Sequence, residues 1–546
     1  MNGIICRVKS FMGINHVETK EGEEIPPKNM TEAIQRLPES YHKYMGEELP
    51  YRRAAALTFI VIVLGMGTPL WYHTTRTYRA PFVVFPKSQT VSFNVQIHLT
   101  VTDATLEPEL NSMCQNLSSM LLEGEVKPPL DIRWEVLNQG VRELRALEND
   151  RMEPSNSLAV HVAVVPLEQW SHFSAVTVYL SRGRWAFLQY TVDSNKFMER
   201  LQSLIWEVMV DVPHMNEIVK RDIRERLQPW QITALSPSHQ KRLVWDSAPL
   251  SMNYIVQVIH VHDNASPSDA YSKDIVNVLE VFVKRLQHIT RIQPSFEHLW
   301  DFEISNFLDA DVQGRLTLSQ QGTERLLKEV DSQLQSVESS YPVLKIVIME
   351  VDAPVIMLDP FGEDSRGVAV ASWGAIIPRI CVGETSEDPQ TAARILSALR
   401  VLLGVDSDLP ASWKRAPVPL ADWEIERMRL RAILDNAMRA ISAIGALKAL
   451  TEKITNVVIN DDVAARANEA VHLVQAGLEN PGAPQLNKIS AGRFLADEAL
   501  SHPSLLSLLY FPKDQTMAVY LPIMLPTLIP LFGSGLALCK WALGWS

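Results

Sequence analysis

Hydrophobic and polar positions alternate in several short runs in the first two thirds of the chain, as they do in half-buried β-strands. The clearest run covers residues 91–101, where every odd position from Val91 to Val101 is apolar and every even position is polar. The strands predicted in this way are 91–101, 158–165, 175–180, 185–190, 254–261 and 343–351. The last run is almost wholly apolar, which is typical of a central strand covered on both faces.

Helical periodicity alternates with these strands. Apolar positions follow the 3.6-residue period in 197–208 and 268–286, and Asp388-Pro389 begins a third helix that ends before Gly404. The alternation predicts an α/β body over residues 73–419, with helices packed on a mixed sheet.

The pattern changes after Pro419. Residues 422–454 carry apolar side chains at three-to-four spacing and predict one long amphipathic helix. Further helices are expected to begin near 460–462 and after the 481–484 break, so residues 420–516 form a helical region.

Two charge-free apolar stretches predict membrane spans, at 54–72 and 517–539. At 1.5 Å per residue the first reaches roughly 28 Å, close to the thickness of a bilayer core. More than fifty residues precede it, which argues against a cleaved signal peptide. The second could instead be a GPI-attachment signal, but its spacer region is apolar and Lys540 follows it, so a span is the better interpretation.

Two spans place both ends of the chain on one side of the membrane. The body is then expected in the lumen, between a cytosolic tail (1–53), flexible over residues 1–50, and a cytosolic end (540–546). The positive charges flanking the first span are balanced and do not decide the orientation. Two glycosylation sequons, at Asn116 and Asn264, favour a luminal body, although Pro267 follows the second one.

Charge and cysteine content exclude several classes of protein. The chain has 51 basic and 63 acidic residues, a net charge of −12, and no clustered basic run, so nucleic-acid binding is not expected. Four scattered cysteines, Cys6, Cys114, Cys381 and Cys539, fit neither a disulfide framework nor a zinc motif. Cys114 and Cys381 could pair in an oxidising lumen, but two buried thiols are the simpler expectation.

A search for catalytic motifs finds no recognised set of residues and predicts no cofactor. His260 and His262 lie on one strand face, where they could share a metal ion, but a strand running out into a polar loop beside a sequon is the preferred interpretation, so no metal site is predicted. Glu350 and Asp352 end an apolar strand and are the best candidates for acidic catalysis, which leaves a luminal glycan-modifying enzyme as the alternative function.

Three prolines recur every four residues in the second span, at Pro522, Pro526 and Pro530. Each lacks an amide hydrogen and leaves the carbonyl four residues earlier without its helical donor. In hydrocarbon such carbonyls need other partners. The proline face therefore packs either against the first span of the same chain or against other membrane subunits, and both remain open.

Three sequence blocks together resemble the PIG-S family, a subunit family of the GPI transamidase of the endoplasmic reticulum. They are LGMGTPLWYHTTRTYRA (64–80), KITNVVINDDVA (453–464) and HPSLLSLLYFPKDQTMAVYLPIMLPTLIP (502–530), the last including the proline series. The order of spans, body and long helices agrees over residues 52–540. The extended tail and the short ending at Ser546 depart from the family pattern.

The resemblance implies a subunit without catalytic residues of its own. Such a subunit would assemble with a cysteine-protease-like catalytic subunit and with other membrane subunits, and would support transfer of preformed GPI to proteins. It would do so by stabilising the complex, or by presenting the substrate peptide or the GPI lipid.

Overall fold

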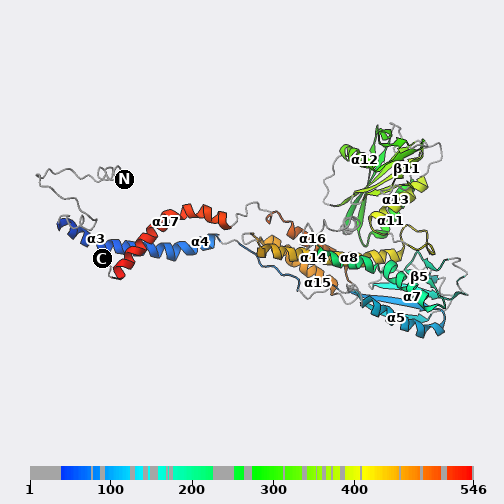
Figure 1. Cartoon of the computed structure of the whole chain (residues 1–546), viewed down its shortest axis with the longest axis horizontal. Coiled ribbons are helices and arrows are strands. Elements are labelled where there is room, and N and C mark those ends of the chain that lie inside the picture. The colour runs from blue at the N-terminus through cyan, green and yellow to red at the C-terminus, as the bar shows by residue number, and fades with distance from the viewer. Residues whose placement is uncertain are drawn as a thin grey trace. The chain divides into compact units, whose positions relative to one another are not determined.

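A computed structural model of the chain divides into two compact units, residues 1–77 with 508–546, and residues 78–507 (Figure 1). The residues that it describes are 39–75, 78–86, 91, 93–122, 130–138, 146–147, 158–167, 170, 176–224, 251–262, 273–310, 314–334, 341–351, 353–358, 364–370, 373–380, 388–405, 409–453, 457–479, 484–505 and 513–543.

The first unit pairs two apolar helical segments that are long enough to cross a membrane, which confirms the two predicted apolar helices. The amino-terminal segment is α3 (Glu39–Ile62), a π-helical turn (Val63–Gly67) and α4 (Thr68–Thr75), and the carboxy-terminal one is α17 (Lys513–Ala542). The helix thus begins at Glu39, so part of the stretch expected as a flexible polar tail is helical.

Aromatic contacts at both ends of the pair show that the two segments run antiparallel. Trp71 meets Tyr520 edge-on with ring centroids 6.5 Å apart, and the Arg53 guanidinium lies 4.9 Å above the Trp541 ring. Each contact joins the beginning of one segment to the end of the other.

Within residues 78–507, a six-stranded mixed sheet has the order β15-β4-β5-β3-β1-β2. Its strands are β1 (Phe93–Val101), β2 (Leu130–Asn138), β3 (Ala159–Val165), β4 (Val178–Leu180), β5 (Trp185–Gln189) and β15 (Trp413–Arg415). All neighbours are parallel except β4 and β5. The predicted alternation of β1 is confirmed, since Val95, Ile97 and Leu99 are fully buried.

A second, five-stranded sheet has the order β13-β14-β10-β6-β7. Its strands are β6 (Asn253–Val261), β7 (Arg291–Leu299), β10 (Val343–Val351), β13 (Val368–Val370) and β14 (Gly374–Ile380). Only β13 is antiparallel to its neighbour, so the carboxyl ends of the other four strands meet at one edge. As predicted, β10 is central and has buried apolar residues on both faces.

Helices cover both faces of this second sheet. Buried residues of α11 (Lys273–Leu286) and α13 (Asp388–Leu402) share a core with Ile346 and Ile348. On the other face α12 (Gln320–Gln333) packs over Val347 and Met349, beside a small sheet of β8 (Asp309–Ala310), β9 (Leu316–Leu318), β11 (Val355–Leu358) and β12 (Asp364–Ser365).

The prediction of a mixed sheet flanked by helices is therefore confirmed in kind, but the described strands form three sheets rather than one. Alternating polarity identifies a strand without saying which strand it pairs with. Helices α5 (Glu107–Leu122), α7 (Ser194–Gln202) and α8 (Val212–Arg224) contribute to the core around the first sheet.

The predicted carboxy-terminal helices are α14 (Asp422–Lys453), α15 (Asp461–Leu478) and α16 (Leu486–Leu500). Buried ion pairs tie the first turns of α14 to both large sheets. Arg400 of α13 binds Glu424 at 2.6 Å, and Arg184, in the β4–β5 turn, binds Glu426 at 2.9 Å. At the other end of α14, the Arg79 guanidinium donates a hydrogen bond to the Thr451 carbonyl at 2.9 Å.

Candidate functional site

Polar side chains collect where the parallel strands of the second sheet end. His260 belongs to β6 and His262 follows it directly, while His298 is in β7 and Glu350 in β10. His260 and His298 are paired in register, and Glu350 is paired with Arg379 of β14. Carboxyl ends of parallel strands are the usual place for binding sites in α/β sheets.

Glu350 holds two of these imidazoles. Its Oε1 lies 2.9 Å from Nε2 of His260, and its Oε2 lies 2.6 Å from Nδ1 of His262. Arg379 donates to Glu350 Oε1 at 3.0 Å. Nε2 of His262 lies 3.0 Å from Nδ1 of His298, which extends the network by one more ring.

Burial and hydrogen bonding set the charges in this cluster. His260 and His262 are 3% and 1% exposed. Burial lowers the pKa of His260, so its ring is neutral at physiological pH. Burial alone would raise the pKa of Glu350, but its bonds to His260 and His262 outweigh that effect and lower the pKa to about 2. The cluster therefore holds an ionised carboxylate facing imidazole N–H groups.

These contacts weigh against Glu350 as a catalytic acid or base. Its oxygens already accept from two histidines and one arginine, and a general base needs to reach a substrate proton. Asp352, its partner in the sequence-based hypothesis, lies outside the described residues. The carboxylate that the strand pattern suggested is thus placed in a histidine network rather than at an open strand end.

The sequence analysis missed three members of this cluster, His298, Arg379 and Trp300. Trp300 stacks on His262 with ring centroids 4.2 Å apart. Strand β7 was not predicted because Pro294 interrupts it, and proline is unfavourable within a sheet. The strand lies at the sheet edge, where proline is tolerated. The sequence did offer one signal of the cluster: histidines lie on both sides of α11, at His260 and His262 before it and at His298 after it.

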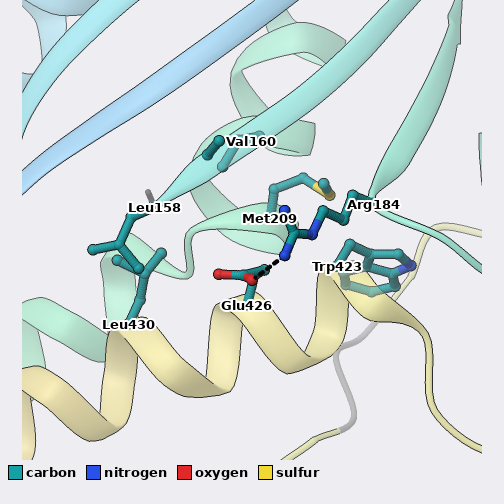
Figure 2. A pocket seen from close by; sticks show the side chains of 8 residues that line it. Leu158, Val160, Arg184, Met209, Trp423, Glu426 and Leu430 are labelled. Atoms are coloured by element: carbon teal, nitrogen blue, oxygen red, sulfur yellow. Dashed lines mark hydrogen bonds and ion pairs between the residues drawn. The ribbon is translucent and has the colours of Figure 1, made fainter. Parts of the chain in front are cut away.

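A small pocket lies between the first sheet and α14, lined by apolar side chains such as Leu158 and Leu430 (Figure 2). The ion pair between Arg184 and Glu426 crosses it. Burial raises the pKa of Glu426 despite the nearby arginine charges. Because most of its lining side chains are apolar, we interpret the pocket as a packing feature at the start of α14.

The three prolines of α17 face away from its partner helix. Pro522, Pro526 and Pro530 are all exposed. The partly buried residues of α17 in this stretch are Tyr520, Met524 and Leu528. Of the two interpretations left open by the sequence, packing of the proline face against the chain's own first span does not occur in this structure. Figure 1 shows α17 as a bent helix.

The sequons and cysteines fall in different surroundings. Asn116 is exposed on α5, and the hydroxyl of Ser118 in its sequon accepts from Trp134 Nε1 at 2.6 Å. Asn264 and Cys381 lie outside the described residues. Cys114 is a free, buried thiol whose pKa burial raises to about 12, so it is an inert core residue in this structure.

Comparisons with known proteins all point to one protein family, which matches most of the chain. The model of the PIG-S family, described as phosphatidylinositol-glycan biosynthesis class S protein, matches residues 58–543. Similar curated proteins are each named GPI-anchor transamidase component PIGS. The bovine one is 25% identical over 532 residues, and the rat one 27% over 533, each covering 88% of this chain and 93% of the relative. The human one is 24% identical over 548 residues, 89% of this chain and 94% of the relative.

Proposed function

Because the chain belongs to the PIG-S family of phosphatidylinositol-glycan biosynthesis class S proteins, we propose that it is a non-catalytic subunit of the GPI transamidase. In this role it supports the attachment of preformed GPI to the carboxyl terminus of precursor proteins. The names of its relatives, as components of that transamidase, support the assignment to the complex. A luminal glycan-modifying enzyme is not favoured by these relatives.

The proposed location is the membrane of the endoplasmic reticulum, with residues 73–516 in the lumen and both ends in the cytosol. Two helices apolar enough to span a bilayer support the two-span arrangement. Their antiparallel pairing, through Trp71–Tyr520 and Arg53–Trp541, brings the outer ends of the two segments together. Asn116, exposed on α5, is the proposed glycan acceptor among the described residues, and Asn264 remains a second candidate.

The absence of catalysis is supported by the contacts of the acidic candidate. Glu350 is committed to two histidines and Arg379. Among the described residues its cluster includes no serine or cysteine nucleophile, which covalent acyl transfer requires. As the family resemblance implies, we assign the reacting residues to a cysteine-protease-like partner subunit. The contribution of this chain is to stabilise the complex, or to present the substrate peptide or the GPI lipid.

The family match over residues 58–543 carries the role in the transamidase, and the exposed proline face of α17 carries the proposal of where its partners dock. The carbonyls of Ala518, Pro522 and Pro526 lose the amide donor that a regular helix would supply, because the residue four positions later is proline. A lipid tail cannot donate to them. Donors on a neighbouring helix can, so we propose that the helices of other transamidase membrane subunits dock on this face.

Purification of the tagged chain in mild detergent tests the proposal. The other transamidase subunits should co-purify in near-stoichiometric amounts with the wild-type chain. The double variant Pro526→Leu/Pro530→Leu regains two helical N–H donors and straightens the helix. We expect its recovery of partners to fall by about tenfold, equivalent to roughly 1.4 kcal/mol of association free energy.

A matched control changes the other side of the same helix. Met524→Leu/Leu528→Met conserves apolar volume at two partly buried positions, and it should leave partner recovery unchanged. If wild-type protein purifies alone, the transamidase role is wrong. If the proline variant recovers partners as well as the control does, the role stands but the docking face is wrong.

A further inference from the structure

We propose that His260, His262 and His298 form a binding site for a divalent transition-metal ion such as Zn²⁺. One ring nitrogen from each of the three lies within 4.8 Å of the others. This inference goes beyond the assembly role and does not depend on it. It rests on the placement of three imidazoles, from two adjacent parallel strands, at the carboxyl edge of the second sheet.

The spacing of the nitrogens is close to what zinc requires. Zinc binds imidazole nitrogen at about 2.0–2.1 Å in a tetrahedron, so its ligand atoms lie about 3.3 Å apart. Nε2 of His262 and Nδ1 of His298 are already 3.0 Å apart. The His260 ring centroid lies 4.2 Å from that of His262 and 5.6 Å from that of His298. A modest ring rotation would bring the third ligand in.

Glu350 orients the ligands through their other nitrogens. Nδ1 of His262 donates its hydrogen to Oε2 of Glu350 at 2.6 Å, which leaves the lone pair on Nε2, the nitrogen that faces His298. Nε2 of His260 is similarly 2.9 Å from Oε1. A carboxylate behind a ligating imidazole, fixing its tautomer, is the usual outer layer of protein metal sites.

Proton balance does not oppose binding. Without metal, Nδ1–H of His298 can donate to the lone pair of His262. With metal, the hydrogen of His298 moves to its Nε2, and Nδ1 becomes a ligand. The hydrogen moves within the ring, so this change of tautomer releases no proton.

The surrounding charges select the class of ion. Arg379 lies 3.3 Å from His260 Nε2 but also pairs with Glu350 at 3.0 Å, so one positive and one negative charge flank the histidines. The site therefore attracts a cation through nitrogen lone pairs rather than through excess negative charge. Such ligands suit Zn²⁺, Cu²⁺ or Ni²⁺, whereas Ca²⁺ and Mg²⁺ prefer oxygen.

One side of the cluster is closed by an aromatic ring. Trp300 stacks on His262 and lies 5.4 Å from His298 between centroids. The stack limits ring movement and excludes water from that face. Three nitrogen ligands leave a fourth position for water or for a group from a partner.

Metal content of the purified full-length chain tests the site. Protein in detergent is incubated with a small excess of Zn²⁺, passed through a desalting column and measured by inductively coupled plasma mass spectrometry. We expect about one zinc per wild-type chain. His298→Ala removes the least buried ligand and should reduce binding affinity at least tenfold. Glu350→Gln should weaken it by about 10- to 100-fold, as outer-layer changes do.

His288→Ala is the matched control, because His288 is exposed in the turn between α11 and β7, outside the cluster. It should bind zinc like the wild type. The melting temperature of each variant in EDTA shows whether the apo fold is kept. Should His298→Ala fail to fold, Co²⁺ added to the wild-type chain decides, since four-coordinate Co²⁺, with three imidazoles and one water, absorbs visible light strongly.

The proposal is overturned if the wild-type chain retains no more zinc than a detergent blank and shows no cobalt absorption. It is also overturned if a folded His298→Ala variant binds zinc as tightly as wild type. The histidines would then form, with Glu350 and Arg379, a charge network without metal. Neither outcome changes the expected co-purification of transamidase subunits, so the two proposals fail separately.

Discussion

Each of the two large sheets places a histidine beside another on adjacent parallel strands, yet the two pairs have different surroundings. In the first sheet His98 of β1 is in register with His161 of β3, and the rings stack with centroids 4.9 Å apart. In the second sheet His260 of β6 is in register with His298 of β7, with centroids 5.6 Å apart. The backbone relationship is the same in both sheets.

The carboxylates that bind the two pairs differ in their burial and in the number of imidazole rings that each one binds. Among the described residues Glu135 pairs with one ring, that of His98 at 2.9 Å, and it is 57% exposed, whereas Glu350 is 19% exposed and binds two rings. His161 is closed off by Trp185, with centroids 4.8 Å apart, and its Nδ1 has no hydrogen-bond partner within the described residues.

Position along the strand explains the difference. The first pair lies within its strands, where the neighbouring positions are filled by sheet residues. The second pair lies at the strand ends, so His262, beyond β6, can join it, and Glu350 reaches it from β10. A histidine pair thus becomes a potential binding site only where the sheet edge lets further polar groups converge.

Removal of the two carboxylates should produce the largest contrast. Glu350→Ala leaves two buried imidazoles and Arg379 without their shared acceptor, and should cost about 3 kcal/mol of local stability. Glu135→Ala, the same change at an exposed pair, should cost about 0.5 kcal/mol or less. Hydrogen exchange of the β6 and β1 amides measures each local free energy of opening. Equal losses in the two sheets would contradict the comparison.

The stability of the chain should fall in acid because of His161, the buried neutral histidine of the first sheet. Burial, with the nearby charges of His98 and Arg184, lowers the pKa of His161 from 6.5 to about 4. The unfolded chain therefore binds a proton that the folded chain does not, and stability falls as the pH drops from 6.5 towards 4. Linkage gives a loss of about 2 kcal/mol at pH 5 relative to pH 7.5.

His161→Leu cannot take up that proton in either state, so its variant should lose correspondingly less stability on acidification. Urea titrations at pH 7.5 and pH 5 measure the difference between variant and wild type. An identical acid loss in both proteins would show that His161 is not the titrating group.

The smallest expected effect concerns the ring that covers the second pair. Trp300 is 36% exposed and stacks on His262. Trp300→Leu keeps an apolar side chain but removes the stack, which should cost about 1 kcal/mol. Hydrogen exchange at the end of β6 is the readout, and exchange that does not change would mean that the tryptophan merely covers the histidine.

Local sequence patterns predicted many of the strands and helices, but they did not predict which strands pair with which. The alternation in 91–101, the cap at Asp388 and the period of 422–454 each correspond to an observed strand or helix. These features depend on neighbours a few positions apart. The partition into three sheets depends on which strands meet, and periodicity does not encode that.

The site was only partly visible for the same reason. His260 and His262 were recognised because they share one strand face, and Glu350 because it ends an apolar run. His298 comes from a proline-containing edge strand, and Arg379 from a neighbouring parallel strand. Their convergence is a property of the sheet order, so it became visible only in three dimensions. The sequence shows that the three prolines of α17 share one face of the helix, but it does not show what that face packs against.

Helix α14 has a mechanical consequence. Its 32 residues extend about 48 Å at 1.5 Å per residue. One end is clamped to the sheets by buried ion pairs to Arg400 and Arg184, and the other accepts Arg79, which follows the first apolar helix closely in the chain. Such a helix acts as a strut. A pull on the chain at Arg79 therefore acts along the helix axis on the ion pairs at the other end of α14.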